Sequence, residues 1–167
     1  MQKTGIFYGS STGTTEDVAQ RIAAKLGVDS ADIYNVGETN VDKVASYDVL
    51  ILGSSTWGVG DLQDDWEDFL PKLKKTDLSG KAVAIFLTRI SSSFGASFFD
   101  AIGKIPNAFI ASGCSFRGPI PLVLYTLDDS TAVIHRQPVV FAIYLKTGAN
   151  LTHQRIAKWD TQLKRTR

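Results

Sequence analysis

The sequence predicts an α/β fold: one domain built on a doubly wound, five-stranded parallel sheet with helices on both faces. Residues 3–8, 47–53 and 81–87 are short apolar runs, as expected of central strands covered on both sides, and residues 31–36 indicate another strand. Amphipathic segments alternate with these runs, and strand–helix alternation is typical of parallel sheets. The 167 residues, of which 44% are hydrophobic and 21% charged, suit a single globular domain over residues 1–167.

Four segments are predicted to be helices: residues 15–26, 64–74, 97–105 and 152–164. Apolar residues at helical spacing place Val18, Ile22 and Leu26 on one face of the first helix. The second helix is acidic and amphipathic. Its end carries a lysine cluster that suits the negative end of a helix dipole: Lys72, Lys74 and Lys75.

The second half of the chain is expected to complete the sheet and to cover it. Pro106 stops the third predicted helix, because the residue before a proline disfavours helical backbone. Residues 113–146 are predicted to hold a fifth strand, which a surface excursion interrupts and which resumes at residues 139–145. Thr152 is expected to cap the closing helix. The inward-facing side chains of that helix are expected to be Ile156, Trp159 and Leu163.

Ligands of doubly wound sheets bind beyond the carboxyl ends of the strands, which here are three loops: residues 9–15, 54–61 and 87–97. The first loop reads GSSTGTT and holds five hydroxyls and two glycines but no lysine or arginine. The N–H groups and the dipole of the helix that follows favour a phosphate dianion without a cationic side chain. The G-x-x-x-x-G-K-S/T pattern of nucleotide-hydrolysing loops is absent. We therefore interpret the ligand as a phosphate that is held, that of a flavin mononucleotide (FMN).

The second loop, SSTWGVGD, places a large aromatic side chain, Trp57, where polar residues are usual. An exposed tryptophan suits stacking on a flat ring system. Gly58 beside it can adopt φ of either sign, so its carbonyl could turn to accept a proton-bearing flavin nitrogen. Both features fit a flavin ring at this edge of the sheet.

Several stretches of the chain resemble bacterial flavodoxins of the long-chain type. The matching stretches, in order and at the right spacing, are TGIFYGSSTGTTEDVAQRIA, YDVLILGSSTWGVGDLQDDWEDF and GKAVAIF, and LTHQRIAKWDTQL resembles the last flavodoxin helix. The resemblance implies the strand order 2-1-3-4-5 and the interrupted fifth strand of the long-chain branch. It also implies non-covalently bound FMN and the transfer of single electrons between redox enzymes, with no catalytic residue.

The resemblance assigns roles to residues of all three loops. The phosphate would be held by Ser10, Ser11, Thr12, Gly13, Thr14 and Thr15. Residues 56–58 would edge the isoalloxazine ring, and Trp57 would stack on one of its faces. Phe94 falls where the family has a tyrosine that covers the other face. The further residues expected at the cofactor are Ser54, Ser55, Thr56, Gly58, Leu87, Thr88 and Arg89.

Charges near the predicted site bear on the redox role. Flavodoxins usually carry a Gly-x-Gly-Asp-Gln stretch in the third loop, whereas this chain has LTRISSSF and places Arg89 there. Acids beside the ring would, together with the phosphate, disfavour further negative charge on the flavin, and Arg89 would oppose that effect. The acids in question are Asp61, Asp64, Asp65, Glu67 and Asp68.

Composition excludes several other functions. The net charge of +1 is the sum of −5 over residues 1–86 and +6 over residues 87–167. The basic half has no dense run of lysines and arginines interleaved with aromatic residues, which argues against nucleic-acid binding. The single Cys114 excludes an internal disulfide and is expected to be a small buried residue, and His135 and His153 lack metal-ligand spacing. No apolar run reaches the roughly 20 residues of a membrane span. We expect a cytoplasmic monomer that meets redox partner proteins, such as a reductase, transiently.

Two other functions remain open from the residues alone. An FMN-dependent quinone or NAD(P)H reductase needs room over the flavin for a second planar substrate, and aromatic residues on both faces, Trp57 and Phe94, argue against that room. A phospho-acceptor signalling domain needs acids after the first and third strands, where this chain has glycine–serine pairs. Turnover of NADPH with a quinone, without a separate reductase, would distinguish a reductase from a carrier.

Overall fold

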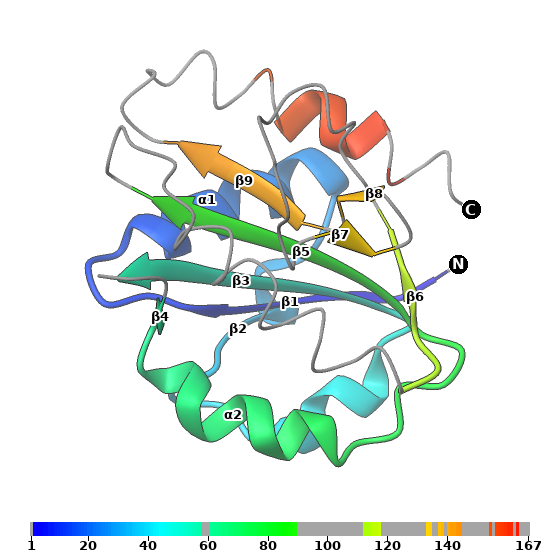
Figure 1. Cartoon of the computed structure of the whole chain (residues 1–167). Coiled ribbons are helices and arrows are strands. Elements are labelled where there is room, and N and C mark those ends of the chain that lie inside the picture. The colour runs from blue at the N-terminus through cyan, green and yellow to red at the C-terminus, as the bar shows by residue number, and fades with distance from the viewer. Residues whose placement is uncertain are drawn as a thin grey trace.

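A parallel sheet crosses the computed structural model, with helices packed on both of its faces (Figure 1). The structure describes residues 2–57, 61–89, 112–117, 133–134, 137–138, 140–144, 154, 156–161 and 163. Strands alternate with helical segments over the first half of the chain, as predicted. The helix predicted at residues 97–105, the proline that was to stop it and the predicted cap Thr152 lie outside the described residues.

The main sheet has the strand order that the resemblance implied. Its first four positions are β2 (Ile33–Asn35), β1 (Thr4–Gly9), β3 (Val49–Trp57) and β5 (Ala82–Arg89). Two strands share the fifth position: β6 (Ser115–Phe116) pairs in parallel with the start of β5, and β9 (Val140–Tyr144) pairs in parallel with its end. The predicted interruption of the fifth strand, and its return close to residue 139, are therefore confirmed.

Short antiparallel pairs accompany this sheet. β4 (Asp61–Leu62) pairs antiparallel with the end of β3, with Trp57 in register with Asp61. β7 (Val133–Ile134) pairs with β8 (Gln137–Pro138), and both lie in the sequence between the two pieces of the fifth strand. The interruption thus contains a small hairpin of its own.

The helices α1 and α2 begin within one residue of their predicted starts: α1 spans Thr14–Leu26 and α2 spans Asp65–Lys74. Gly27 ends α1 in the left-handed conformation (φ 72°), from which its N–H donates to the Ala23 carbonyl. Residues 156–161 are also helical, inside the closing helix that the sequence predicts.

Two 3₁₀ turns flank β2: η1 (Ser30–Asp32) and η2 (Val41–Ser46). The strand predicted at residues 31–36 is shorter in the structure, where it is confined to β2. The Asp29 carboxylate accepts a hydrogen bond from the Ala31 N–H at 2.9 Å and so caps η1 where the strand was expected to start.

Two apolar clusters, one on each face of the sheet, join the layers. On one face, α2 packs Trp66, Phe69 and Leu73 against alternate residues of β3 and β5. On the other face, the members contributed by helical segments include Val18, Ile22, Ile156, Trp159 and Leu163. The inward faces predicted for the first and last helices are thus confirmed, except that Leu26 is only partly buried at the edge of its cluster.

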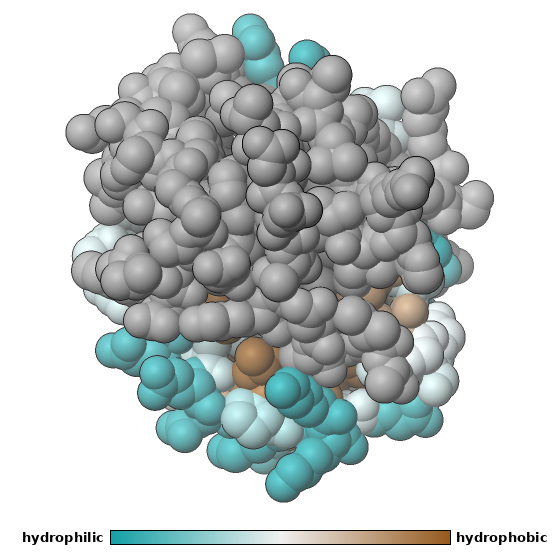
Figure 2. Space-filling model, in the orientation of Figure 1, coloured by the Kyte–Doolittle hydropathy of each residue, from teal (hydrophilic) through white to brown (hydrophobic). Residues whose placement is uncertain are grey.

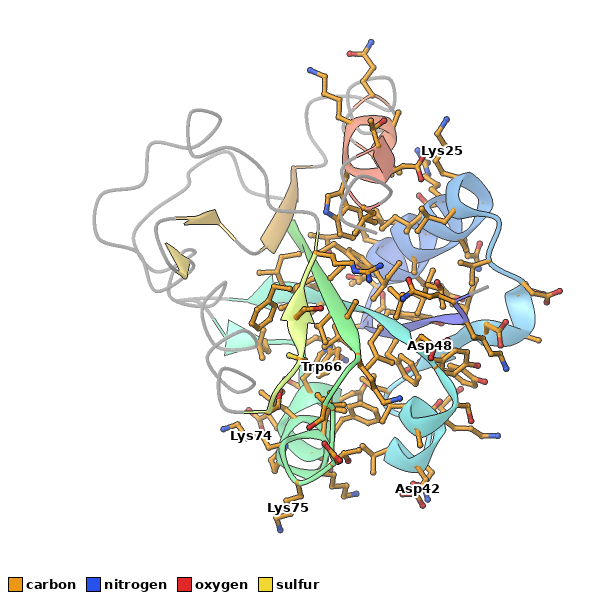
Figure 3. All side chains as sticks on the ribbon, turned by 90° about the vertical axis from the view of Figure 1, so that its right-hand side faces the viewer. Lys25, Asp42, Asp48, Trp66, Lys74 and Lys75 are labelled. Atoms are coloured by element: carbon orange, nitrogen blue, oxygen red, sulfur yellow. The ribbon has the colours of Figure 1, made fainter. Side chains whose placement is uncertain are left out.

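The surface over α2 is mostly hydrophilic (Figure 2), because Glu67, Asp68, Lys72 and Lys74 are exposed while the apolar face of the helix is buried. Lys74 and Lys75 project outward at the end of the helix (Figure 3). Cys114, expected to be buried, is half-buried at the edge of the cluster on the α2 side. Within the described ranges, no helix has the length and hydropathy needed to cross a membrane, and no three potential metal-ligating side chains come together.

Candidate cofactor site

The carboxyl ends of three parallel strands meet at one edge of the sheet, on the left of Figure 1. Gly9, which ends β1, lies in register with Ser54 of β3, and Ser55 lies in register with Thr88 of β5. The structure therefore brings the starts of the three predicted loops together, as the winding of the sheet predicts.

The first loop leaves β1 and enters α1 through Gly13. Gly13 has a φ of +83°, and no side chain caps the helix that follows. Its N–H donates to the Ser10 hydroxyl at 3.1 Å, and the hydroxyl oxygens of Thr12 and Thr14 lie 3.3 Å apart. Because Ser11, Thr12 and Gly13 are exposed, the tip of the loop is open to a ligand.

Charge in this loop comes from the helix rather than from cationic side chains. No basic residue stands between Lys3 and Arg21 in the sequence, and Arg21 is paired with Asp17 at 2.8 Å. An anion at the loop would be held by hydroxyls, N–H groups and the positive end of the α1 dipole. The described loop thus has the neutral character that the predicted phosphate cradle requires.

Thr15 connects the first turn of α1 to β5. Its side chain is fully buried, and its Oγ1 lies 2.8 Å from Thr88 Oγ1, so the two hydroxyls share a hydrogen bond. Thr88 stands next to the end of β5. The first turn of α1 is thereby tied to the strand that leads into the third predicted loop.

Ser54 and Ser55, near the end of β3, differ in their hydrogen bonding. The Ser54 hydroxyl donates to the Ser55 carbonyl at 2.8 Å and accepts from the Gln63 N–H at 3.1 Å. Ser55 Oγ is buried and has no hydrogen-bond partner among the described residues. Residues in register on parallel strands share a face, so Ser55 lies on the same side of the sheet as Thr88. A buried hydroxyl without a partner is costly, which makes Ser55 a candidate ligand contact.

The structure corrects the predicted start of the second and third loops. Residues 54–57, expected in a loop, continue β3: residues 54 and 55 pair with β5, and residues 56 and 57 pair with β4. Residues 87–89 likewise end β5 and pair with β9. Polar side chains interrupt the apolar pattern there, but the backbone ladder continues. Trp57 thus ends a strand instead of standing at the tip of a loop.

For some residues predicted to contact the cofactor, the structure describes only the backbone, and others lie outside the described residues. The backbones of Thr56 and Arg89 lie in β3 and β5 respectively, at the site edge. Gly58 and Phe94, expected beside the flavin ring, lie outside the described residues.

Gln63, which follows β4, is a site residue that the sequence analysis missed. Its side chain is 3% exposed and contacts both Ser11 of the first loop and Asp65 at the start of α2. Close by, the Trp66 indole N–H donates to the Gly53 carbonyl at 3.0 Å and ties α2 to the sheet (Figure 3). A single glutamine belongs to no motif, so the sequence carries no signal that would have singled it out.

Asp65 is the acid of α2 that the structure connects to the first loop. Its carboxylate accepts from Gln63 Nε2 at 2.8 Å, and the same nitrogen donates to Ser11 Oγ. Asp65 also lines, with Asp68 and Lys72, a cavity of about 410 Å³ between α2 and the segment after β2. A neutral amide thus stands between this carboxylate and Ser11 of the first loop.

Comparisons with known proteins agree on one family. The family model described as Flavodoxin matches residues 6–134. Flavodoxin 1 of Escherichia coli is 35% identical over 164 residues, which cover 98% of this chain and 93% of that protein. Flavodoxin 1 of Azotobacter vinelandii is 38% identical over 163 residues, which cover 95% of this chain and 94% of that protein.

A solved structure shares the fold over its whole length. It is the crystal structure of Fusobacterium nucleatum flavodoxin bound to flavin mononucleotide, which matches with a TM-score of 0.86 and 27% sequence identity. The match covers 99% of both chains, and so includes the strand edge where the candidate site lies.

Proposed function

This chain belongs to the flavodoxin family, and from that premise we propose that it carries single electrons between redox proteins on a non-covalently bound FMN. The observation that carries the proposal is the neutral cradle at the uncapped start of α1, beside the unpaired hydroxyl of Ser55. The relatives that it matches are flavodoxins, which are electron-transfer proteins rather than enzymes, and one of them was solved with FMN. A reductase that turns over its own substrate is therefore not favoured.

The described residues fit FMN in two respects. The first loop leaves space over Gly13, where an added Cβ would meet nothing within 4 Å, and it offers hydroxyls with no cation among them. Ser55 Oγ is buried without a partner among the described residues, and a ligand rich in hydroxyl and phosphate oxygens would supply one. A phosphate-bearing ligand with a polar chain satisfies both features.

The proposed contacts fall into a phosphate set and a flavin set. The phosphate would be held by Ser10, Ser11, Thr12, Gly13, Thr14 and Thr15. The rest of the cofactor would contact Ser54, Ser55, Thr56, Trp57, Gly58, Leu87, Thr88, Arg89 and Phe94. Bound FMN supplies the redox chemistry. The chain itself binds and orients the flavin and sets the charge around it.

The partners would be redox proteins that this chain meets transiently, as a monomer in the cytoplasm. The exposed acids and lysines over α2 give a hydrophilic surface (Figure 2). Permanent interfaces are larger and more apolar than short-lived ones, so such a surface suits brief encounters.

Flavin binding is the first test. We expect the purified chain to be yellow and to release FMN on acid treatment. The apoprotein should then rebind FMN, as measured by quenching of flavin fluorescence. Failure of a folded apoprotein to bind FMN would contradict the proposal.

A steady-state assay tests the choice between carrier and reductase. With NADPH and a quinone, the chain alone should show no appreciable turnover. Electrons should reach an acceptor protein only when a separate flavodoxin-reducing enzyme is added. Appreciable turnover by the chain alone would favour the reductase.

A further inference from the structure

Gln63 joins separate segments of the candidate site. Its Nε2 donates to Ser11 Oγ at 3.3 Å and to Asp65 Oδ2 at 2.8 Å, and its Oε1 accepts from the Asp65 N–H at 3.0 Å. Its backbone N–H donates to Ser54 Oγ at 3.1 Å and to the Ser55 carbonyl at 3.2 Å. The side chain, 3% exposed, makes these contacts away from water.

Chemistry determines which way the Gln63 amide points. The Asp65 N–H can only donate, so the amide atom that faces it must be the oxygen. Nε2 then has two protons and two acceptors, Ser11 Oγ and Asp65 Oδ2. A Cβ atom added at Gly9 would overlap Gln63 Oε1. The glycine at this position therefore leaves room for the amide group of Gln63.

This arrangement leaves the Ser11 hydroxyl ready to donate. A hydroxyl that accepts one hydrogen bond keeps its own proton for another partner, and phosphate oxygens are acceptors. A glutamate in place of Gln63 would reverse the arrangement, because a carboxylate can only accept and would draw the Ser11 proton to itself. It would also add negative charge beside Asp65 and next to the phosphate.

We propose that Gln63 is a positioning residue for the phosphate of FMN: it holds Ser11 as a hydrogen-bond donor and separates the cradle from the Asp65 carboxylate. The inference rests on the proposed function. It gives the segment that follows β4 a part in holding the phosphate.

Comparing the binding of FMN with that of riboflavin, which lacks the phosphate, distinguishes a role of Gln63 at the phosphate from a general structural role. Dissociation constants for FMN and riboflavin are measured on full-length apoproteins of the wild type, Gln63→Glu and Gln63→Leu. Both variants lose the hydrogen bond from Gln63 Nε2 to Ser11 Oγ. This loss should weaken FMN binding by about tenfold or more and riboflavin binding by less than about threefold. The control is Tyr34→Phe on β2, which loses the 2.6 Å hydrogen bond between the Tyr34 and Tyr47 hydroxyls and should leave the ratio of the two constants unchanged.

A double-mutant cycle tests whether Gln63 acts through Ser11. Gln63→Leu should weaken FMN binding much less in a Ser11→Ala background than in the wild type, because the contact is already absent. Thermal unfolding of each apoprotein shows that the variants compared are folded, and the uncharged Gln63→Met replaces Gln63→Leu in the cycle if the latter does not fold.

The outcomes distinguish this inference from the proposed function. Equal weakening of FMN and riboflavin, no weakening, or strictly additive effects with Ser11→Ala would overturn the role of Gln63. A wild-type apoprotein that binds neither flavin would instead overturn the proposed function.

Discussion

The side-chain oxygens of Thr15 and Thr88 lie 2.8 Å apart in the interior, although 73 positions separate the two residues. Thr15 stands in the first turn of α1, and Thr88 stands next to the end of β5. Gln63 makes a second such connection, from the segment after β4 to Ser11. Two polar contacts between distant residues therefore hold the segments of the candidate site against one another.

Replacing Thr88 by valine should destabilise the apoprotein by about 1–3 kcal/mol, because the buried Thr15 hydroxyl loses its partner while the side-chain shape is nearly kept. Urea unfolding measures the change. Thr161→Val is a matched control, since it removes an exposed hydrogen bond of 3.1 Å from Thr161 Oγ1 to the Ala157 carbonyl. The control should change stability by less than about 0.5 kcal/mol. Equal losses in the two variants would show that the buried pair adds no particular stability.

Replacing Ser55 by alanine should separate stability from cofactor binding. Ser55 Oγ has no partner among the described residues, so the apoprotein should keep its stability to within about 0.5 kcal/mol or gain slightly. FMN binding should weaken by about 1 kcal/mol, the typical net value of one hydrogen bond. Urea unfolding and fluorescence titration measure the two quantities. An unchanged FMN dissociation constant would exclude Ser55 from the cofactor contacts.

Replacing Trp57 by alanine should weaken FMN binding by about 1–3 kcal/mol, as expected when a planar ligand loses an aromatic stacking partner. Trp57→Phe, which keeps an aromatic ring at the end of β3, should retain most of the affinity. Fluorescence titration with FMN measures both variants. If the alanine variant binds as tightly as the phenylalanine variant, Trp57 does not stack on the flavin.

Tyr47 should make stability fall in alkali. Burial first, and then hydrogen bonds with Tyr34 and Asp32, raise the pKa of Tyr47 above its ordinary value of 10.0. The Tyr47 hydroxyl lies 2.6 Å from the Tyr34 hydroxyl and donates to Asp32 Oδ1 at 2.7 Å. The unfolded chain releases this proton near pH 10 while the folded chain keeps it, so the stabilisation present below about pH 10 is lost as the pH rises further.

The check on Tyr47 is a comparison of urea unfolding at several pH values. Between about pH 9.5 and pH 11, the free energy of unfolding should fall more steeply for the wild type than for Tyr47→Phe, which has no proton to lose at this position. Parallel curves for the two proteins would show that Tyr47 does not retain its proton in the folded state.

The order of the strands β1, β2, β3 and β5 with the helices α1 and α2, the inward faces of the first and last helices, and a first loop without cationic side chains were predictable from the sequence. Apolar runs mark β1, β3 and β5, and helical spacing marks Val18 and Ile22 on α1, because burial and backbone period show in residues close together in the chain. The GSSTGTT loop is equally local, since the same few residues supply the hydroxyls, the glycine of positive φ and the start of the helix.

The tertiary structure alone decided where the strands end and which polar groups meet. β3 runs on to Trp57 because β4 folds back to pair with it. Gln63 reaches Ser11 across 52 positions, and Thr15 reaches Thr88 across 73. Both contacts follow from the register of the sheet, which sets distant segments side by side. A hydrogen bond needs its two heavy atoms within roughly 3.5 Å, and no local pattern specifies which distant side chains the register brings that close.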